Sequence, residues 1–168
     1  MRPYESDYHH SYKSYVGMVK ENDCVQAMEH SIISALSMLK QIPEAKADFR
    51  YAPEKWTVKQ VVAHIIDTER VMTYRALRFA RNDSHELAGF DEKQYSTNTN
   101  AENRTMPNLI RELELLRASN LLMFSSFNSS MLSHKGVANN CVFTVNALGY
   151  ILAGHLLHHC KVLEEKYL

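Results

Sequence analysis

Four stretches of about 20 residues carry apolar side chains at spacings of three and four, the period of one face of an α-helix. No other pattern in the chain constrains the fold as strongly. The stretches run from 22 to 43, 58 to 81, 105 to 129 and 144 to 165. Nowhere between them do residues alternate as they do in a half-buried strand. Together they predict an all-α chain, folded as an antiparallel four-helix bundle with long loops.

Residues that favour helix starts lie at the beginning of all four stretches. Their side-chain oxygens can accept hydrogen bonds from the free amides of the first helical turn. These N-cap candidates are Asn22 or Asp23 for the first stretch, then Thr57, Thr105 and Thr144. Trp56 directly precedes Thr57, and we expect it to anchor the entry to the second helix by packing on its first turn.

The chain of 168 residues fits one domain, 1–168, in which residues 1–21 form an N-terminal arm that packs on the bundle. Lys plus Arg and Asp plus Glu number 19 each, and no basic run occurs, so we expect no nucleic-acid or membrane partner. Three cysteines without CxxC spacing favour a reducing compartment. Because no apolar signal region or membrane-spanning run is present, we expect a cytoplasmic protein.

Two histidines four residues apart, His155 and His159, lie near the middle of the apolar stripe of the last helix. The stripe is formed by Leu148, Leu152, Val162 and Leu163. Residues at this spacing share a helix face, so both imidazoles can reach one metal ion. The alternative is a pair of core histidines that are hydrogen-bonded to neighbours, since unpaired buried polar groups are costly. Spacing and face leave both interpretations open.

The second helix carries three further polar candidates. Glu69 falls in the centre of its apolar stripe, which favours a buried, partnered acid with a structural role over a catalytic one. His64 lies at the flank of the stripe and is weak evidence by itself. Asp67, one turn further on, could orient the His64 ring by accepting a hydrogen bond from it.

The segment from Asn82 to Arg104 is rich in polar residues and lacks helical periodicity. Gly89-Phe90-Asp91 and Tyr95 are its distinctive residues. Loops of this length in a compact domain are often functional, but a mobile connector explains the composition equally well.

Several sequence blocks, in this order, resemble the DinB-like (YfiT-like) family of four-helix-bundle proteins. Each block is moderately specific, and jointly they cover nearly the whole chain. They are Tyr51-Ala52-Pro53-Glu54-Lys55-Trp56-Thr57-Val58-Lys59, His64-Ile65-Ile66-Asp67-Thr68-Glu69-Arg70, Tyr74-Arg75-Ala76-Leu77-Arg78, Gly89-Phe90-Asp91 and Gly154-His155-Leu156-Leu157-His158-His159.

The resemblance implies a divalent metal, often nickel or zinc, held by three histidines on two helices. Carried over to this chain, the ligands are His64, His155 and His159. Three protein ligands leave coordination positions open, which is typical of a catalytic site. The family implies a metal-dependent enzyme acting on a small molecule, either a transferase that uses a low-molecular-weight thiol or a hydrolase, and it also implies a possible homodimer.

The remaining roles are less constrained. Arg75 and Tyr95 are candidate substrate contacts, and Asp67 and Glu69 are weak candidates for a general base. A non-catalytic bundle that binds metal or a small molecule in a stress response is one alternative. A structural or interaction protein with histidines in its core is another.

Overall fold

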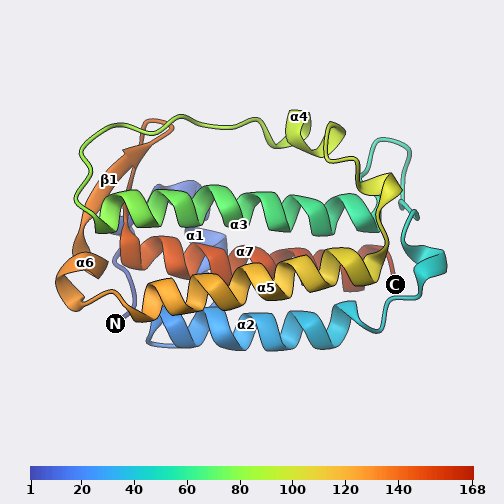
Figure 1. Cartoon of the computed structure of the whole chain (residues 1–168), viewed down its shortest axis with the longest axis horizontal. Helices are drawn as coiled ribbons and strands as arrows, with labels where there is room; N and C mark the ends of the chain where they lie inside the picture. The colour runs from blue at the N-terminus through green and yellow to red at the C-terminus, as the bar shows by residue number, and fades with distance from the viewer.

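The computed structural model describes all residues, 1–168, and contains four long helices packed as a bundle (Figure 1). These helices are α2 (Cys24–Leu39), α3 (Val58–Ala80), α5 (Met106–Ser125) and α7 (Val145–Lys166). Around the bundle, α2 packs beside α7, α7 beside α3, α3 beside α5, and α5 beside α2. The predicted four-helix bundle is therefore confirmed, and α2 and α3, which are consecutive in the chain, lie diagonally across it.

The order of helix directions departs from a simple up-and-down bundle. Figure 1 shows that α3 and α5 run in the same direction, because the segment between them returns along the length of the bundle. The same figure shows α2 and α7 running in the direction opposite to α3 and α5. The pair α3 and α7 is thus antiparallel, which brings the first half of α3 beside the second half of α7.

All four long helices begin at a predicted N-cap residue, and α2 uses Asp23 rather than Asn22. Asp23 accepts hydrogen bonds from the amides of Val25 and Gln26, and Thr57 forms a reciprocal capping box with Gln60. Thr105 and Thr144 each accept one hydrogen bond from an amide three residues further on. These bonds set the start of each helix, and in α3 the cap fixes the position of Trp56 beside it.

The connection before α7 contains a β-hairpin, although the sequence between the helical stretches shows no strand-like alternation. Strands β1 (Lys135–Ala138) and β2 (Cys141–Thr144) pair antiparallel and follow a short helix α6 (Ser129–Ser133). Asn139 and Asn140, between the strands, both have positive φ, as a tight hairpin turn requires. Strands of four residues are too short to produce a recognisable alternation in the sequence, which is why periodicity did not predict them.

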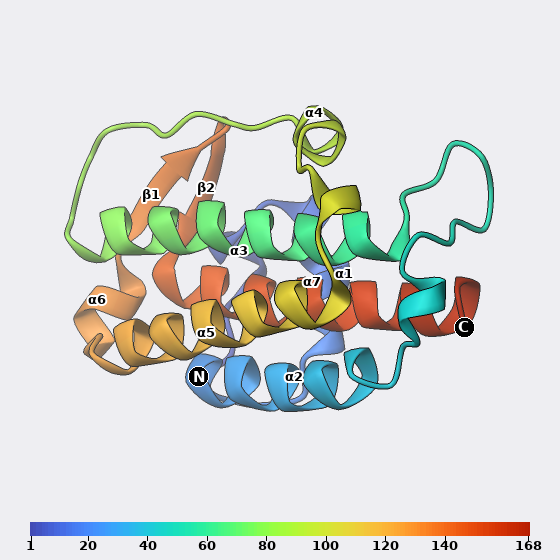
Figure 2. The same cartoon turned by 45° about the vertical axis from the view of Figure 1, so that its right-hand side comes forward.

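Two short helices cover the outside of the bundle. Helix α4 (Glu92–Thr97) begins at the cap Asp91 and packs on α3, as Figure 2 shows above the bundle. Helix α1 (Lys13–Met18), in the N-terminal segment, packs on α7. Gly154 permits this contact, because a Cβ atom there would lie 2.0 Å from the carbonyl oxygen of Tyr15. No helix in the structure has the combination of length and apolar character needed to span a membrane.

Candidate metal centre

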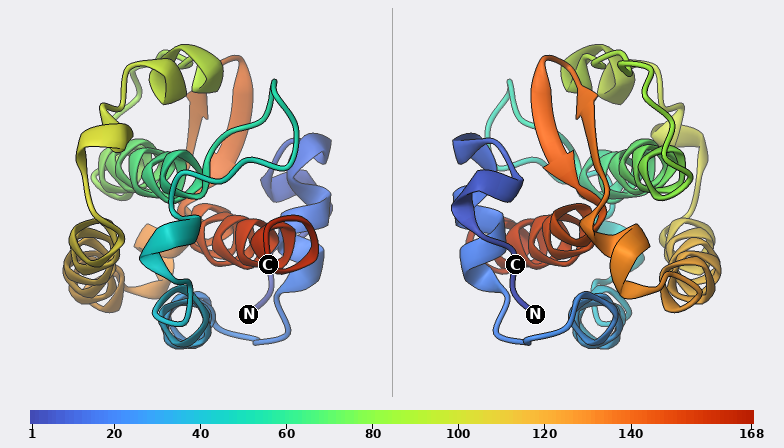
Figure 3. Two further views of the ribbon diagram at one scale, coloured as in Figure 1. Left: turned by 90° about the vertical axis from the view of Figure 1, so that its right-hand side faces the viewer. Right: turned by 90° about the vertical axis from the view of Figure 1, so that its left-hand side faces the viewer.

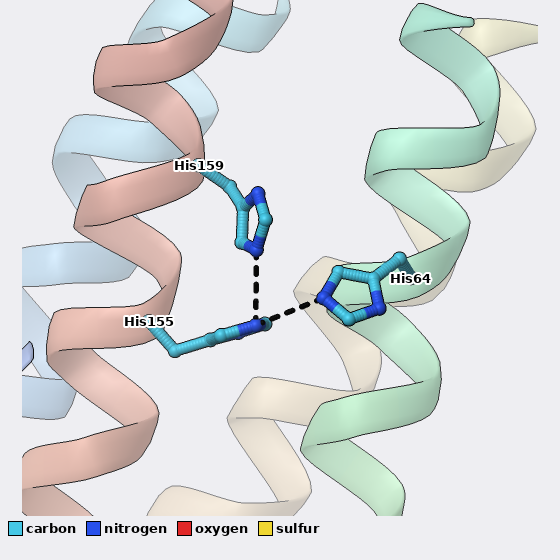
Figure 4. Close-up of side chains that lie close together, drawn as sticks. All are labelled: His64, His155 and His159. Carbon is cyan, nitrogen blue, oxygen red and sulfur yellow. Dashed lines mark hydrogen bonds between the residues drawn. The ribbon is translucent and has the colours of Figure 1, made fainter. Parts of the chain in front are cut away.

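Three histidine side chains converge between α3 and α7 (Figure 4). The Nε2 atom of His155 lies 3.0 Å from Nε2 of His64 and 3.1 Å from Nε2 of His159. All three donor atoms lie within 4.8 Å of one another. His64 and His155 are buried and His159 is partly buried. The structure therefore brings together the three residues that the resemblance selected.

Aromatic side chains from outside the two helices surround the histidines. The Trp56 ring packs against His64 with 4.8 Å between ring centroids. The Tyr15 ring meets His155 edge to face at 5.5 Å. Tyr15 reaches this position because Gly154 lets α1 approach α7 closely. Both aromatic rings hold an imidazole in place and restrict the access of water to it.

The three imidazoles are neutral at neutral pH. Burial lowers the pKa of His64 to about 4. Burial, together with the neighbouring His64 and His158, lowers the pKa of His159 to about 3. The fully enclosed His155 has a pKa well below its ordinary value for the same reasons. A neutral imidazole can offer a lone pair to a metal, so these shifts keep the centre in its ligating form.

Hydrogen bonds among the three rings do not satisfy this arrangement. The Nε2 atom of His155 carries either one proton or one lone pair, so it makes one good hydrogen bond and not two. Its two contacts therefore compete for a single group. One divalent ion satisfies the lone pairs together, and donors bound about 2.0–2.1 Å from an ion lie roughly 2.8–3.4 Å apart at octahedral or tetrahedral angles. The two short separations are close to these values, and the donor set fits a metal.

A cleft of about 750 Å³ leads to the histidine centre and includes His158 and His159 in its lining. The other walls come from the connector between α2 and α3, the start of α3, one face of α4 and the end of α7. Figure 3 shows this connector arching over the end of the bundle between α4 and α1. The cleft gives a small molecule a path to the centre.

Glu69 is not part of the centre. Its carboxylate is buried and accepts two hydrogen bonds of 2.6 Å from the guanidinium of Arg117 and one of 3.0 Å from the amide of Asn120. Arg117 also donates to the carbonyl of Met28 and to the hydroxyl of Ser31 on α2. This network joins α3, α5 and α2, so the carboxylate of Glu69 has a structural role.

Asp67 does not orient His64, because the structure has no hydrogen bond between them. Instead Asp67 lines a second cavity of about 590 Å³ between α3, α4 and α5, together with Tyr95, Arg104 and Glu112. Burial raises the pKa of Asp67. The expected interaction fails because the His64 ring points towards His155 on α7, whereas Asp67 faces the cavity between α3, α4 and α5.

Arg75 lies about 16.5 Å along α3 from His64, because it is eleven positions further along the helix. Its buried guanidinium donates a 3.0 Å hydrogen bond to the carbonyl of Ala88 and lies over the Phe90 ring. Arg75 therefore fastens the segment before α4, and neither Arg75 nor Tyr95 lines the cleft beside the histidines.

Sequence reasoning missed Tyr15 and the three cations that line the cleft, Arg50, Lys55 and Lys93. Tyr15 reaches the centre only through tertiary packing, and nothing in its local sequence signals this contact. The sequence predicts an anchoring role for Trp56, and the structure adds a second role, because the Trp56 ring also packs against His64. The block from Tyr51 to Lys55 supplies much of the cleft wall, so the resemblance could have indicated it.

Comparisons with known proteins agree with this architecture. A family model described as the DinB superfamily matches residues 29–163. A solved structure, YfiT from Bacillus subtilis, superposes with a TM-score of 0.69 and 19% sequence identity, over 98% of this chain and 91% of that chain. That protein is described as a probable metal-dependent hydrolase with an unusual four-helix bundle topology. No curated protein sequence matches the chain.

Proposed function

The chain belongs to the DinB superfamily, and from that premise we propose that it is a metal-dependent enzyme that acts on a small molecule. One observation carries the proposal: His64, His155 and His159 direct neutral imidazole nitrogens at one another beside an open cleft. Such a cleft has the size of a small-molecule site.

The three histidines would hold one divalent ion. Imidazole nitrogen suits both zinc and nickel, and we take one of these two as the native metal. An ion bound there supplies a Lewis acid, which lowers the pKa of water or of a thiol and polarises a carbonyl group. Trp56 and Tyr15 orient the ligand rings and limit solvent on two sides of the centre.

Two reaction classes use this chemistry, hydrolysis with water as nucleophile and transfer with a low-molecular-weight thiol as nucleophile. The description of YfiT as a probable metal-dependent hydrolase supports the first for this chain. The resemblance in the sequence supports the second. Both classes need the same three histidines and the same cleft, so variants of these histidines test the common step.

The test is an activity screen on metal-loaded protein, with ester and amide hydrolysis in one arm and thiol transfer to several electrophiles in the other. We expect activity in one arm and its loss, by at least about 100-fold, in His64→Ala. His30→Ala is the matched control, because His30 is an exposed histidine outside both the converging set and the cleft. Equal activity in the two variants would contradict the proposal.

A second candidate function is a metal-binding module without catalysis. The observation in its favour is that neither Glu69 nor Asp67 reaches the histidines, so no carboxylate in the centre is ready to act as a general base. Bound metal together with silence in both arms of the screen would favour this alternative.

A further inference from the structure

We propose that the cleft beside the histidine centre selects a small molecule that carries an anionic group, a carboxylate or a phosphate, held by Arg50, Lys55 and Lys93. The proposal rests on the proposed function only in taking the histidine centre as the reacting site. It adds a substrate class and the residues that recognise it.

The cleft carries an excess of positive charge, although the formal net charge of the chain is zero. The lining contains three cations, Arg50, Lys55 and Lys93, and one carboxylate, Glu54. The cleft therefore has an excess of two positive charges, while the formal net charge of the whole chain is zero.

These cations lack partners in the folded chain. None of Arg50, Lys55 and Lys93 forms an ion pair, whereas many cations elsewhere do so. The closest polar contact of Arg50 is a 3.5 Å hydrogen bond to the carbonyl of Pro53. Lys55 has its ammonium 5.9 Å from the centre of the Tyr51 ring. Their charges remain available to a ligand.

The cations lie on two separate segments. Arg50 and Lys55 belong to the connector between α2 and α3, and Lys93 belongs to α4. Both segments line the same cleft as His159. A concave site lined by one sign of charge concentrates the electrostatic field and attracts ligands of the opposite sign.

The other residues that line the cleft indicate the chemical character of the rest of the ligand. Tyr51, Trp56 and Tyr167 contribute aromatic surface beside the cations. A molecule with an anionic head and an apolar or planar body satisfies both kinds of wall, and a cleft of about 750 Å³ accommodates a small ligand of this type.

Trp56 makes the proposal directly testable, because it is the only tryptophan in the chain and lines the cleft. Its fluorescence is followed while succinate, inorganic phosphate or the neutral analogue succinamide is added at low ionic strength. We expect a saturable change with succinate or phosphate and none with succinamide, and the comparison of the two anions identifies the preferred head group. Equal responses to succinate and succinamide would overturn the proposal.

The matched variants are Lys55→Gln/Lys93→Gln and Lys20→Gln/Lys161→Gln. The second pair removes the same charge from a different groove, between α2 and α7. We expect the first pair to weaken anion binding about tenfold, since two exposed charge contacts contribute about a factor of three each. The second pair is expected to bind like the unmodified chain. Equal affinities in the two double variants would refute the role of the cleft cations.

The titration is performed on both metal-loaded and metal-free protein. Anion binding by the lysines is expected in both forms. The inference about the anion can therefore be tested even on protein that holds no metal and has no activity. Failure of the proposed function and failure of this inference are thereby distinguished.

Discussion

The guanidinium of Arg117 donates two hydrogen bonds of 2.6 Å to the carboxylate of Glu69 inside the bundle, five residues along α3 from His64. Both side chains are buried, and the pair connects the helix that carries His64 with α5. The ion pair therefore holds α3 in position where one of the candidate ligands is attached.

Removing one partner of this pair should strongly destabilise the protein. Glu69→Ala leaves the Arg117 charge buried without its carboxylate, and we expect a loss of about 3–5 kcal/mol in the free energy of unfolding. Glu165→Ala, which breaks the exposed pair with Lys161, is the control and should cost less than about 1 kcal/mol. Urea denaturation measures both. Similar losses in the two variants would show that the buried pair has no special role.

Gly154 should be intolerant of a side chain. The Cβ atom of Gly154→Ala would collide with the backbone of Tyr15, so α1 must move away from α7 and take the Tyr15 ring from His155. We expect a destabilisation of about 1–3 kcal/mol, the usual range for overpacking.

Gly17→Ala is the matched control, because nothing lies within 4 Å of a Cβ atom there. It should be neutral or slightly stabilising, since alanine favours helix over glycine. Thermal melting compares the two variants, and a Gly154→Ala protein as stable as Gly17→Ala would mean that the close helix contact is dispensable.

The periodicity and the caps in the sequence predicted the four long helices because these signals are local. The choice of His64 from nine histidines needed the resemblance, since a position at the flank of an apolar stripe is weak evidence for a metal ligand. The expected hydrogen bond from His64 to Asp67 is absent because tertiary packing turns the His64 ring towards α7 and leaves Asp67 facing α4 and α5. Tyr15 and Lys93 join the site and its cleft through contacts between distant segments, and no local pattern encodes these contacts.

Two of the three cysteines should be unreactive in the folded protein. Burial raises the pKa of the Cys24 thiol to about 11 and that of the Cys160 thiol to about 12. The thiolate is the reactive form of a cysteine. With these raised pKa values, little thiolate exists at either position at pH 8, so both thiols should react slowly. A disulfide reagent at pH 8 should label one thiol, the partly exposed Cys141. Labelling that persists in Cys141→Ser without unfolding would contradict this prediction.

The same pKa shifts predict an alkaline limit of stability. A thiol that ionises more readily in the unfolded chain favours unfolding once the pH exceeds the ordinary pKa of a cysteine thiol. The stabilising contribution of neutral Cys24 and Cys160 is therefore fully present below about pH 8.5 and is lost as pH rises toward 11–12. Unfolding curves between pH 8 and 11 should show a smaller loss of stability in Cys24→Ala than in the unmodified chain, with each variant compared with its own value at pH 8.

Trp56 should report metal binding. Its ring lies 4.8 Å from the His64 ring, so a paramagnetic Ni²⁺ ion held by His64 is expected to quench the single tryptophan emission. Zn²⁺ has a filled d shell and should quench much less. Fluorescence titration of metal-free protein measures both. Quenching by Ni²⁺ that is unchanged in His64→Ala would place the ion elsewhere.

The most direct test of the account is the metal content of protein prepared without a nickel column, dialysed against Zn²⁺ or Ni²⁺ and measured by mass spectrometry of the elements. We predict one ion per chain in the unmodified protein and in His158→Ala, and none in His155→Ala. An unmodified protein that stays empty, or equal metal content in His155→Ala and His158→Ala, would contradict the assignment of His64, His155 and His159 as a metal centre.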